Sequence, residues 1–262
     1  MPRGRRGAGE PVEPPPRHEP PAIEETIASP ERAWTGRVAV AMGRVTWGEG
    51  NVIDVETRRG LFVLAQMCRS PYLVFFRHFR RDRDWQGTRL APADFLFCTT
   101  VTRQFLKSST IGRVQGVAPL NVDLPTVWIH PDATSRRVTV WEGTPHERSF
   151  ITIGIGGALV RKDVNRDAGG PFKHPSGVFD EILEPSIADV ETIERHELTS
   201  LAVFPLLQER LFLCHGAGKS VDPEKHLLFD LPMPLAFEPY IELIAASTEE
   251  ERRVLQRRYV AA

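Results

Sequence analysis

Three strand-length runs of β-branched and aromatic residues, at 127–129, 137–141 and 149–153, constrain the fold of this chain more than any other feature. Such residues pack well on a pleated surface and are typical of strands. The glycine- and proline-containing segment 142–146 between the second and third runs suits the loop of an antiparallel hairpin. The sequence therefore predicts antiparallel strands in this part of the chain.

Side-chain alternation in the second and third runs predicts which residues face the core. Successive side chains of a strand point to opposite faces of the sheet, so we expect Val138, Val140, Ile151 and Ile153 to share one face. That face needs a cover, and helical patterns on both sides of it in the sequence supply one. We predict an α+β protein with an antiparallel sheet centred on 126–161 and flanked by helices.

Apolar residues at helical spacing predict where those helices lie. Leucine, alanine and cysteine at 61, 64, 65 and 68 follow the i, i+3, i+4, i+7 pattern, which predicts a helix over 55–68. Aromatic residues at 72, 75, 76 and 79 repeat the pattern and predict a second helix, although 73–76 also suits a buried strand. Further predictions are helices over 92–106, over 186–198 and from a capping box at 247–250, and strands over 36–47 and 210–214.

Composition divides the chain into an arm and a folded part. Residues 1–33 are rich in proline and glutamate and offer little to bury, so we predict a disordered arm with a basic tip at Arg3, Arg5 and Arg6. The chain has 262 residues, of which 41% are hydrophobic, so the rest can bury a normal core. We predict one α+β domain over 34–262, with a possible subdivision near 115–125.

The cysteines and the hydropathy pattern predict the compartment. The three cysteines form no C-x-x-C motif, which favours free thiols in a reducing environment. No apolar run approaches the roughly 20 residues that span a bilayer. We therefore expect a cytoplasmic protein without membrane contact.

Charge is distributed unevenly along the chain, although the net charge is only −1. Residues 36–130 carry 13 basic and 7 acidic side chains, whereas 131–262 carry 15 basic and 21 acidic ones. Arginines with interleaved aromatic residues pair with phosphates and stack on bases. The predicted contact residues are Arg77, Arg80, Arg81, Arg83, Trp85, Arg89, Arg103, Lys107 and Arg113.

This basic region leads to our main functional hypothesis, a non-enzymatic, self-associating assembly protein that contacts nucleic acid, of the coat, nucleoprotein or packaging type. Two other uses of the arginines compete with it. They can pair locally with Asp82 and Asp84, or they can accept the acidic segment 180–197 within one chain or between copies, which would build homo-oligomers. A protein-interaction module without nucleic acid is a further alternative.

An enzyme, either a hydrolase or a transferase, is the alternative from a different class. Its site would form where the 163–177 loop meets the 214–226 segment, because nucleophile and base are brought together by the fold. The candidate catalytic residues are His174, Ser176, Cys214 and His215. Segments 154–159 and 215–220 are similar to nucleotide-binding loops but lack the required glycine spacing and the following helix, so no cofactor is predicted.

One string has the start of a calcium-loop pattern. Asp163, Asn165 and Asp167 place oxygen side chains at alternate positions, as the first half of such a loop does. Ala168 stands where the turn requires glycine, and His174 takes the place of the bidentate glutamate. A surface loop with Asx-turns explains the string better, so no metal site is predicted.

Overall fold

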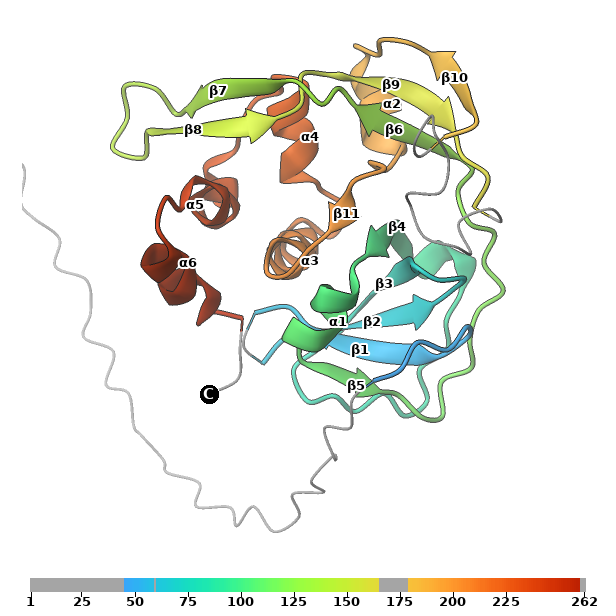
Figure 1. Ribbon diagram of the computed structural model, residues 1–262. Helices are drawn as coiled ribbons and strands as arrows, with labels where there is room; N and C mark the ends of the chain where they lie inside the picture. Colours follow the sequence, from blue (N-terminus) through green and yellow to red (C-terminus); the bar gives the residue numbers. More distant parts are fainter. Residues whose placement is uncertain (1–44, 59, 165–178, 260–262) are drawn as a thin grey trace, which may run out of the picture. The chain divides into compact units, whose positions relative to one another are not determined.

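A six-stranded sheet is the largest element among residues 45–58, 60–164 and 179–259, which are the residues that this computed structural model describes (Figure 1). The strands in spatial order are β11 (Leu201–Ala202), β4 (Phe95–Val101), β3 (Tyr72–Arg80), β2 (Phe62–Met67), β1 (Val52–Glu56) and β5 (Ile111–Arg113). β11 and β4 are parallel, and all other neighbouring strands of this sheet are antiparallel. With the helices described below, the protein is α+β, as predicted.

Both faces of this sheet are covered, which explains the uninterrupted apolar sequences of its central strands. Val63 of β2 packs in one cluster with apolar residues of α3 (Leu206–Ala217). The next residue, Leu64, points the other way and packs in a second cluster with Trp128 of β6 (Val127–Pro131). Because successive side chains both enter a core, β2 needs apolar residues at almost every position.

The predicted helices in this region are wrong. Residues 55–68 contain the end of β1 and all of β2, and residues 72–79 lie in β3. Residues 92–106 contain β4, followed by the short helix α1 (Arg103–Ser108). A continuous apolar run satisfies helical spacing and strand spacing alike, so periodicity alone did not separate them. The alternative of a buried strand at 73–76 is the correct one.

The strands predicted at 126–161 are present, in two smaller sheets. A three-stranded antiparallel sheet has the order β10 (Glu181–Glu184), β9 (Gly157–Arg161) and β6. A two-stranded antiparallel ribbon joins β7 (Ser135–Val140) to β8 (Arg148–Ile153). The predicted hairpin is therefore confirmed, although the largest sheet lies earlier in the chain.

The predicted common face of this hairpin is wrong because of its register. Val138 pairs with Phe150, so these two side chains and Val140 face the core. Ile151 instead lies opposite Arg137, and residues directly opposite each other share a face. As a result Ile151 and Ile153 are 65% and 67% exposed.

The helices cover one face of the large sheet and the inner face of the ribbon. Residues 210–214, predicted as a strand, lie inside helix α3, whose Leu207, Leu211 and Cys214 pack on the sheet. The hydroxyl of Tyr259, a buried residue after the last helix, donates a hydrogen bond to Glu209 Oε2 at 2.6 Å. The remaining helical elements are α2 (Val190–Arg195), α4 (Pro223–Leu228), α5 (Glu238–Ala245), α6 (Glu249–Gln256) and the short 3-10 turns η1 (Pro92–Asp94) and η3 (Leu235–Phe237).

Local signals located two of these helices well. Asp189 caps α2, inside the predicted 186–198. Thr248 caps α6 and Glu251 completes its capping box, one residue after the box predicted at 247–250. The Nε atom of Arg253 lies 3.5 Å from Glu249 Oε1, an ion pair of the i, i+4 type.

Some predictions fall on other parts of the chain. The arm 1–33 and most of the predicted strand 36–47 lie outside the described residues, and 45–47 form no strand. The single domain over 34–262 and its subdivision near 115–125 stay predictions. Within the described ranges, no helix combines the length and apolar character needed to cross a membrane.

Candidate functional site

A buried arginine organises the most polar part of the interior. Arg210 extends from α3, and its Nη2 donates to Glu197 Oε2 at 2.7 Å while Nη1 lies 3.0 Å from Asp222 Oδ2. Its Nε donates to the carbonyl oxygen of Val221 at 3.0 Å, and the guanidinium carbon lies 3.9 Å from the ring centroid of Phe97. Burial acts to lower the pKa of Arg210, but the carboxylates of Asp222 and Glu197 raise it above its ordinary value. Arg210 is therefore a permanent internal cation.

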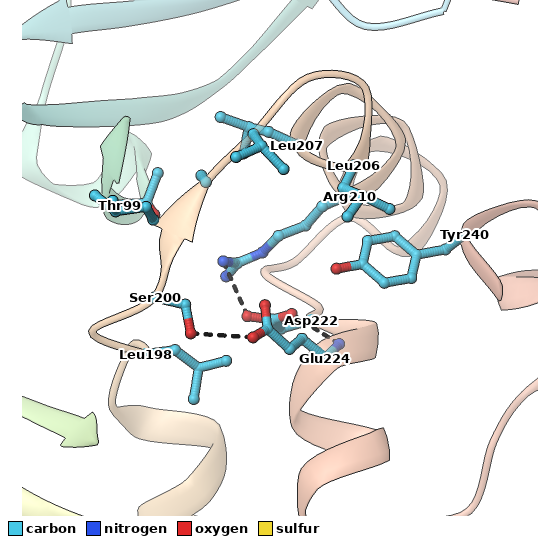
Figure 2. A pocket seen from close by; sticks show the side chains of 12 residues that line it. Thr99, Leu198, Ser200, Leu206, Leu207, Arg210, Asp222, Glu224 and Tyr240 are labelled. Carbon is cyan, nitrogen blue, oxygen red and sulfur yellow. Dashed lines mark hydrogen bonds and ion pairs between the residues drawn. The ribbon is translucent and has the colours of Figure 1, made fainter. Parts of the chain in front are cut away.

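A small cavity of about 50 Å³ adjoins this cluster (Figure 2). Polar side chains reach it from several elements: Thr99 from β4, Ser200 from the turn before β11, Glu224 from α4 and Tyr240 from α5. Ser200 Oγ donates to Glu224 Oε1 at 3.0 Å. Asp222, at the N-cap of α4, accepts from the backbone N–H of Glu224 at 3.0 Å. Residues far apart in the sequence thus meet at one place.

The surroundings of Glu224 raise the pKa of its carboxyl group. Burial, and next the nearby charge of Asp222, raise the pKa of Glu224 to about 7. Burial also raises the pKa of Tyr240 well above its ordinary value, so its hydroxyl keeps its proton. The site therefore combines a permanent cation with a carboxyl group that exchanges its proton near neutral pH.

Replacing Glu224 with glutamine should stabilise the protein at alkaline pH and leave it unchanged in acid. The folded protein binds this proton more tightly than the unfolded chain, so wild-type stability is full below pH 4.5 and falls as pH rises to about 7. The loss above pH 7 is about 3 kcal/mol, since each pKa unit corresponds to about 1.4 kcal/mol. Urea denaturation at pH 4.5 and pH 8 measures this difference. Equal stability of both proteins at pH 8 would show that Glu224 titrates normally.

The sequence patterns do not predict this site. Asp222 falls within the 214–226 segment of the enzyme hypothesis, and Arg210 falls within the predicted strand 210–214. Asp222 followed by Pro223 is a helix-start signal, which would have placed α4 and therefore the backbone around Glu224. The pairing of Arg210 with Glu197 and Asp222 has no local signal, because it depends on how α3 packs.

The residues predicted for an enzyme site do not meet in the described part of the chain. Cys214 is buried, its Sγ accepts from the N–H of Val221 at 3.3 Å, and burial raises its pKa to about 11. A thiol that stays protonated is a poor nucleophile. The neighbouring His215 is exposed, and its ring centroid lies 4.8 Å from that of Phe79. His174 and Ser176 lie outside the described residues.

The predicted metal-like string is described only at its start. The backbone N–H of Asp163 donates to Asp180 Oδ2 at 2.6 Å. Asn165 and Asp167 lie outside the described residues. In the parts of the chain that are described, no three His, Cys, Asp or Glu side chains are arranged to hold a metal ion.

Two of the predicted nucleic-acid contacts serve the fold instead. The carboxylate of Asp54 on β1 accepts a hydrogen bond from Arg83 Nε at 2.9 Å and forms an ion pair with its Nη2. Trp85 Nε1 donates to the same carboxylate at 3.0 Å, and the backbone N–H of Gly112 donates at 2.9 Å. Trp85 and the Asp54 carboxylate are buried, so Arg83 and Trp85 hold the 81–90 loop on the sheet.

The other predicted contacts are on the surface. Arg80 donates to the backbone carbonyl of Asp84, and its guanidinium carbon lies 5.5 Å from the Trp85 ring centroid. Among the residues that the structure describes, the remaining six have no side-chain hydrogen bond or ion pair within range, to the segment 180–197 or elsewhere. These exposed cations are Arg77, Arg81, Arg89, Arg103, Lys107 and Arg113.

Comparisons with known proteins add a family but no activity. No curated protein and no solved structure matches the chain. The model of one family, described as domain of unknown function DUF8309, matches residues 42–232. That match extends over more than half of the chain, from the residues before β1 to those after α4, and the chain belongs to the DUF8309 family.

Proposed function

We propose that this protein is a non-enzymatic, self-associating assembly protein that contacts nucleic acid through the six exposed cations. The observation that carries the proposal is that no described acidic side chain forms an ion pair or a hydrogen bond with Arg77, Arg81, Arg89, Arg103, Lys107 or Arg113. Basic side chains that stand in solvent gain binding energy from phosphates by releasing condensed counterions. Arg83 and Trp85 are removed from the proposed contact set because they bind Asp54.

The uneven charge of the chain supports the self-association part of this proposal. The acidic segment 180–197 forms no described ion pair with the six cations. Three of its acids are paired: Glu191 with Arg195, Glu181 with Arg161, and Glu197 with the internal Arg210. Glu184 and Glu194 are exposed and form no ion pair with described residues, so they are available to other copies, and opposite charges guide such association.

Reversing three of these cations should weaken nucleic-acid binding strongly. The variant Arg77→Glu/Arg81→Glu/Arg89→Glu is expected to bind a 20-nucleotide single strand at least about tenfold more weakly than wild type, with a shallower salt dependence by roughly two to three. Fluorescence anisotropy with DNA and RNA strands between 50 and 200 mM salt measures both quantities. Arg83 is left unchanged, because its replacement would disturb the fold through Asp54.

A second variant controls for net charge. Arg137→Glu/Arg195→Glu/Arg252→Glu changes the total charge equally, but at exposed positions outside the proposed surface. It should lose much less affinity than the first variant. Equal losses would indicate a general charge effect, and absence of wild-type binding at 50 mM salt would refute the nucleic-acid proposal.

An interaction module without nucleic acid is the second candidate, and one observation favours it. Ile151 and Ile153, on the outer face of the β7–β8 ribbon, are 65% and 67% exposed, and Ile155 follows them at 45%. Contiguous exposed apolar side chains are typical of protein interfaces. Light scattering after size-exclusion chromatography, with and without nuclease, separates the two candidates: assemblies that contain no nucleic acid before nuclease treatment and keep their mass after it favour this one.

A further inference from the structure

The cavity beside Arg210 has an apolar part and a polar part. The apolar part includes Leu201 and Val203, which are 37% and 39% exposed. Leu198 and Leu207 form buried parts of the wall. The polar end is formed by Glu224 with Tyr240, together with Ser200 (Figure 2).

The hydroxyl group of Tyr240 has no partner in the described protein. Tyr240 is only 4% exposed, and Figure 2 shows its hydroxyl pointing toward Asp222 and Glu224. No hydrogen bond joins this hydroxyl to any residue within 45–58, 60–164 or 179–259. Tyr240 lines the cavity. Its hydroxyl can therefore form a hydrogen bond with a molecule that enters the cavity.

The charges around the cavity select the kind of molecule. Arg210 contributes one positive charge, and each of its nitrogen atoms already contacts Glu197, Asp222 or the Val221 carbonyl. Three carboxyl groups, of Glu197, Asp222 and Glu224, outweigh that single cation whenever Glu224 is ionised. An anion would be repelled by these carboxylates, whereas a cation would be attracted by them. The volume of about 50 Å³ admits only a few heavy atoms, since one water needs about 10–15 Å³.

We propose that this cavity binds the ammonium end of a small primary alkylamine, either a free amine or a lysine side chain. The ammonium group donates to the Glu224 carboxylate, to which Ser200 already donates, and to the Tyr240 hydroxyl, which accepts. Its methylene groups lie along the leucines of the wall. This site is independent of the proposed nucleic-acid surface, because none of the six exposed cations lines the cavity.

Binding should depend on pH because Glu224 must ionise to pair with the ammonium group. The charged or titratable groups that act on Glu224 are Asp222, which lies two residues before it, Arg210 on α3 and Tyr240 on α5. Of these, Arg210 stays charged, and burial keeps Tyr240 protonated at pH 8. We expect tighter binding at pH 8 than at pH 6, with release of the Glu224 proton.

Calorimetry with ethylammonium chloride tests the site on the full chain. The dissociation constant at pH 8 should be about 1 mM or weaker, as three heavy atoms allow, and ethanol, its neutral isostere, should not bind measurably. Glu224→Gln should weaken ethylammonium binding at least about tenfold and Tyr240→Phe about threefold to tenfold. Tyr259→Phe removes the hydroxyl of a buried tyrosine elsewhere and should change binding less than about twofold.

Two results would overturn the proposal. One is no ethylammonium binding up to 100 mM at constant ionic strength, on the order of 100 times the expected constant, which would mean that the cavity holds only water. The other is equal affinity for wild type, Glu224→Gln and Tyr240→Phe, which would place the amine elsewhere. A third ligand, Nα-acetyl-lysine amide, separates the two sources: comparable binding identifies a lysine side chain, and binding of ethylammonium alone identifies a free amine.

Discussion

Replacing Arg210 with alanine is expected to lower the free energy of unfolding by about 3–5 kcal/mol, the cost of breaking a buried ion pair by removing one partner. The side chains of Glu197 and Asp222 are only 11% and 5% exposed, so water does not replace the lost guanidinium. The Val221 carbonyl also loses its donor, and Phe97 loses its cation–π contact. Urea denaturation followed by tryptophan fluorescence measures the loss.

A surface arginine provides the comparison for this experiment. Arg258 pairs with Glu242 at 2.9 Å, but its side chain is 45% exposed. Arg258→Ala should therefore cost no more than about 1 kcal/mol. If the Arg210 and Arg258 variants lost similar stability, water would be reaching the Arg210 cluster, and its description as a buried network would be wrong.

Replacing Asp54 with alanine is expected to cost a similar amount, about 3–5 kcal/mol. One carboxylate accepts from the Arg83 guanidinium, Trp85 Nε1 and the Gly112 N–H, and all three lose their acceptor together. Asp54→Asn keeps one acceptor oxygen but loses the charge, so it should cost less. Thermal unfolding measured by circular dichroism compares the variants.

An exposed aspartate outside the sheet provides the control for the Asp54 variants. Asp123 is exposed and makes no hydrogen bond within the described residues, so Asp123→Ala should change stability by less than about 0.5 kcal/mol. If Asp54→Ala were as stable as this control, Arg83 and Trp85 would not depend on Asp54 and would return to the list of nucleic-acid contacts.

Local signals in the sequence were reliable where they needed no knowledge of the neighbours. The hairpin of β7 and β8 followed from two β-branched runs around a turn, and the start of α6 followed from its capping box. The faces of the hairpin did not follow, because the pairing of Arg137 with Ile151 depends on the turn and not on either strand alone. A shift of one residue moves every side chain to the other face.

The candidate nucleic-acid contacts likewise divide into features that the local sequence predicts and features that depend on the tertiary structure. The exposed cations on β3, α1 and β5 could be named from the sequence, because a charged side chain stays in solvent unless a partner is built for it. Which arginine has such a partner could not be named: Arg83 and Arg81 are two residues apart, and only Arg83 reaches Asp54. The difference comes from the loop path over the sheet.

The sequence by itself determined the α+β class, the strands near 126–161 and the cap of α6, because turn, cap and β-branched residues act within a few positions of themselves. The tertiary structure alone decided that β1, β2, β3 and β4, within residues 52–101, form a sheet buried on both faces, because helical and strand spacing coincide in a continuous apolar run. It also decided that Arg210, Glu224 and Tyr240 surround one cavity. Those three residues lie on different helices, and only the packing of α3, α4 and α5 brings their side chains together.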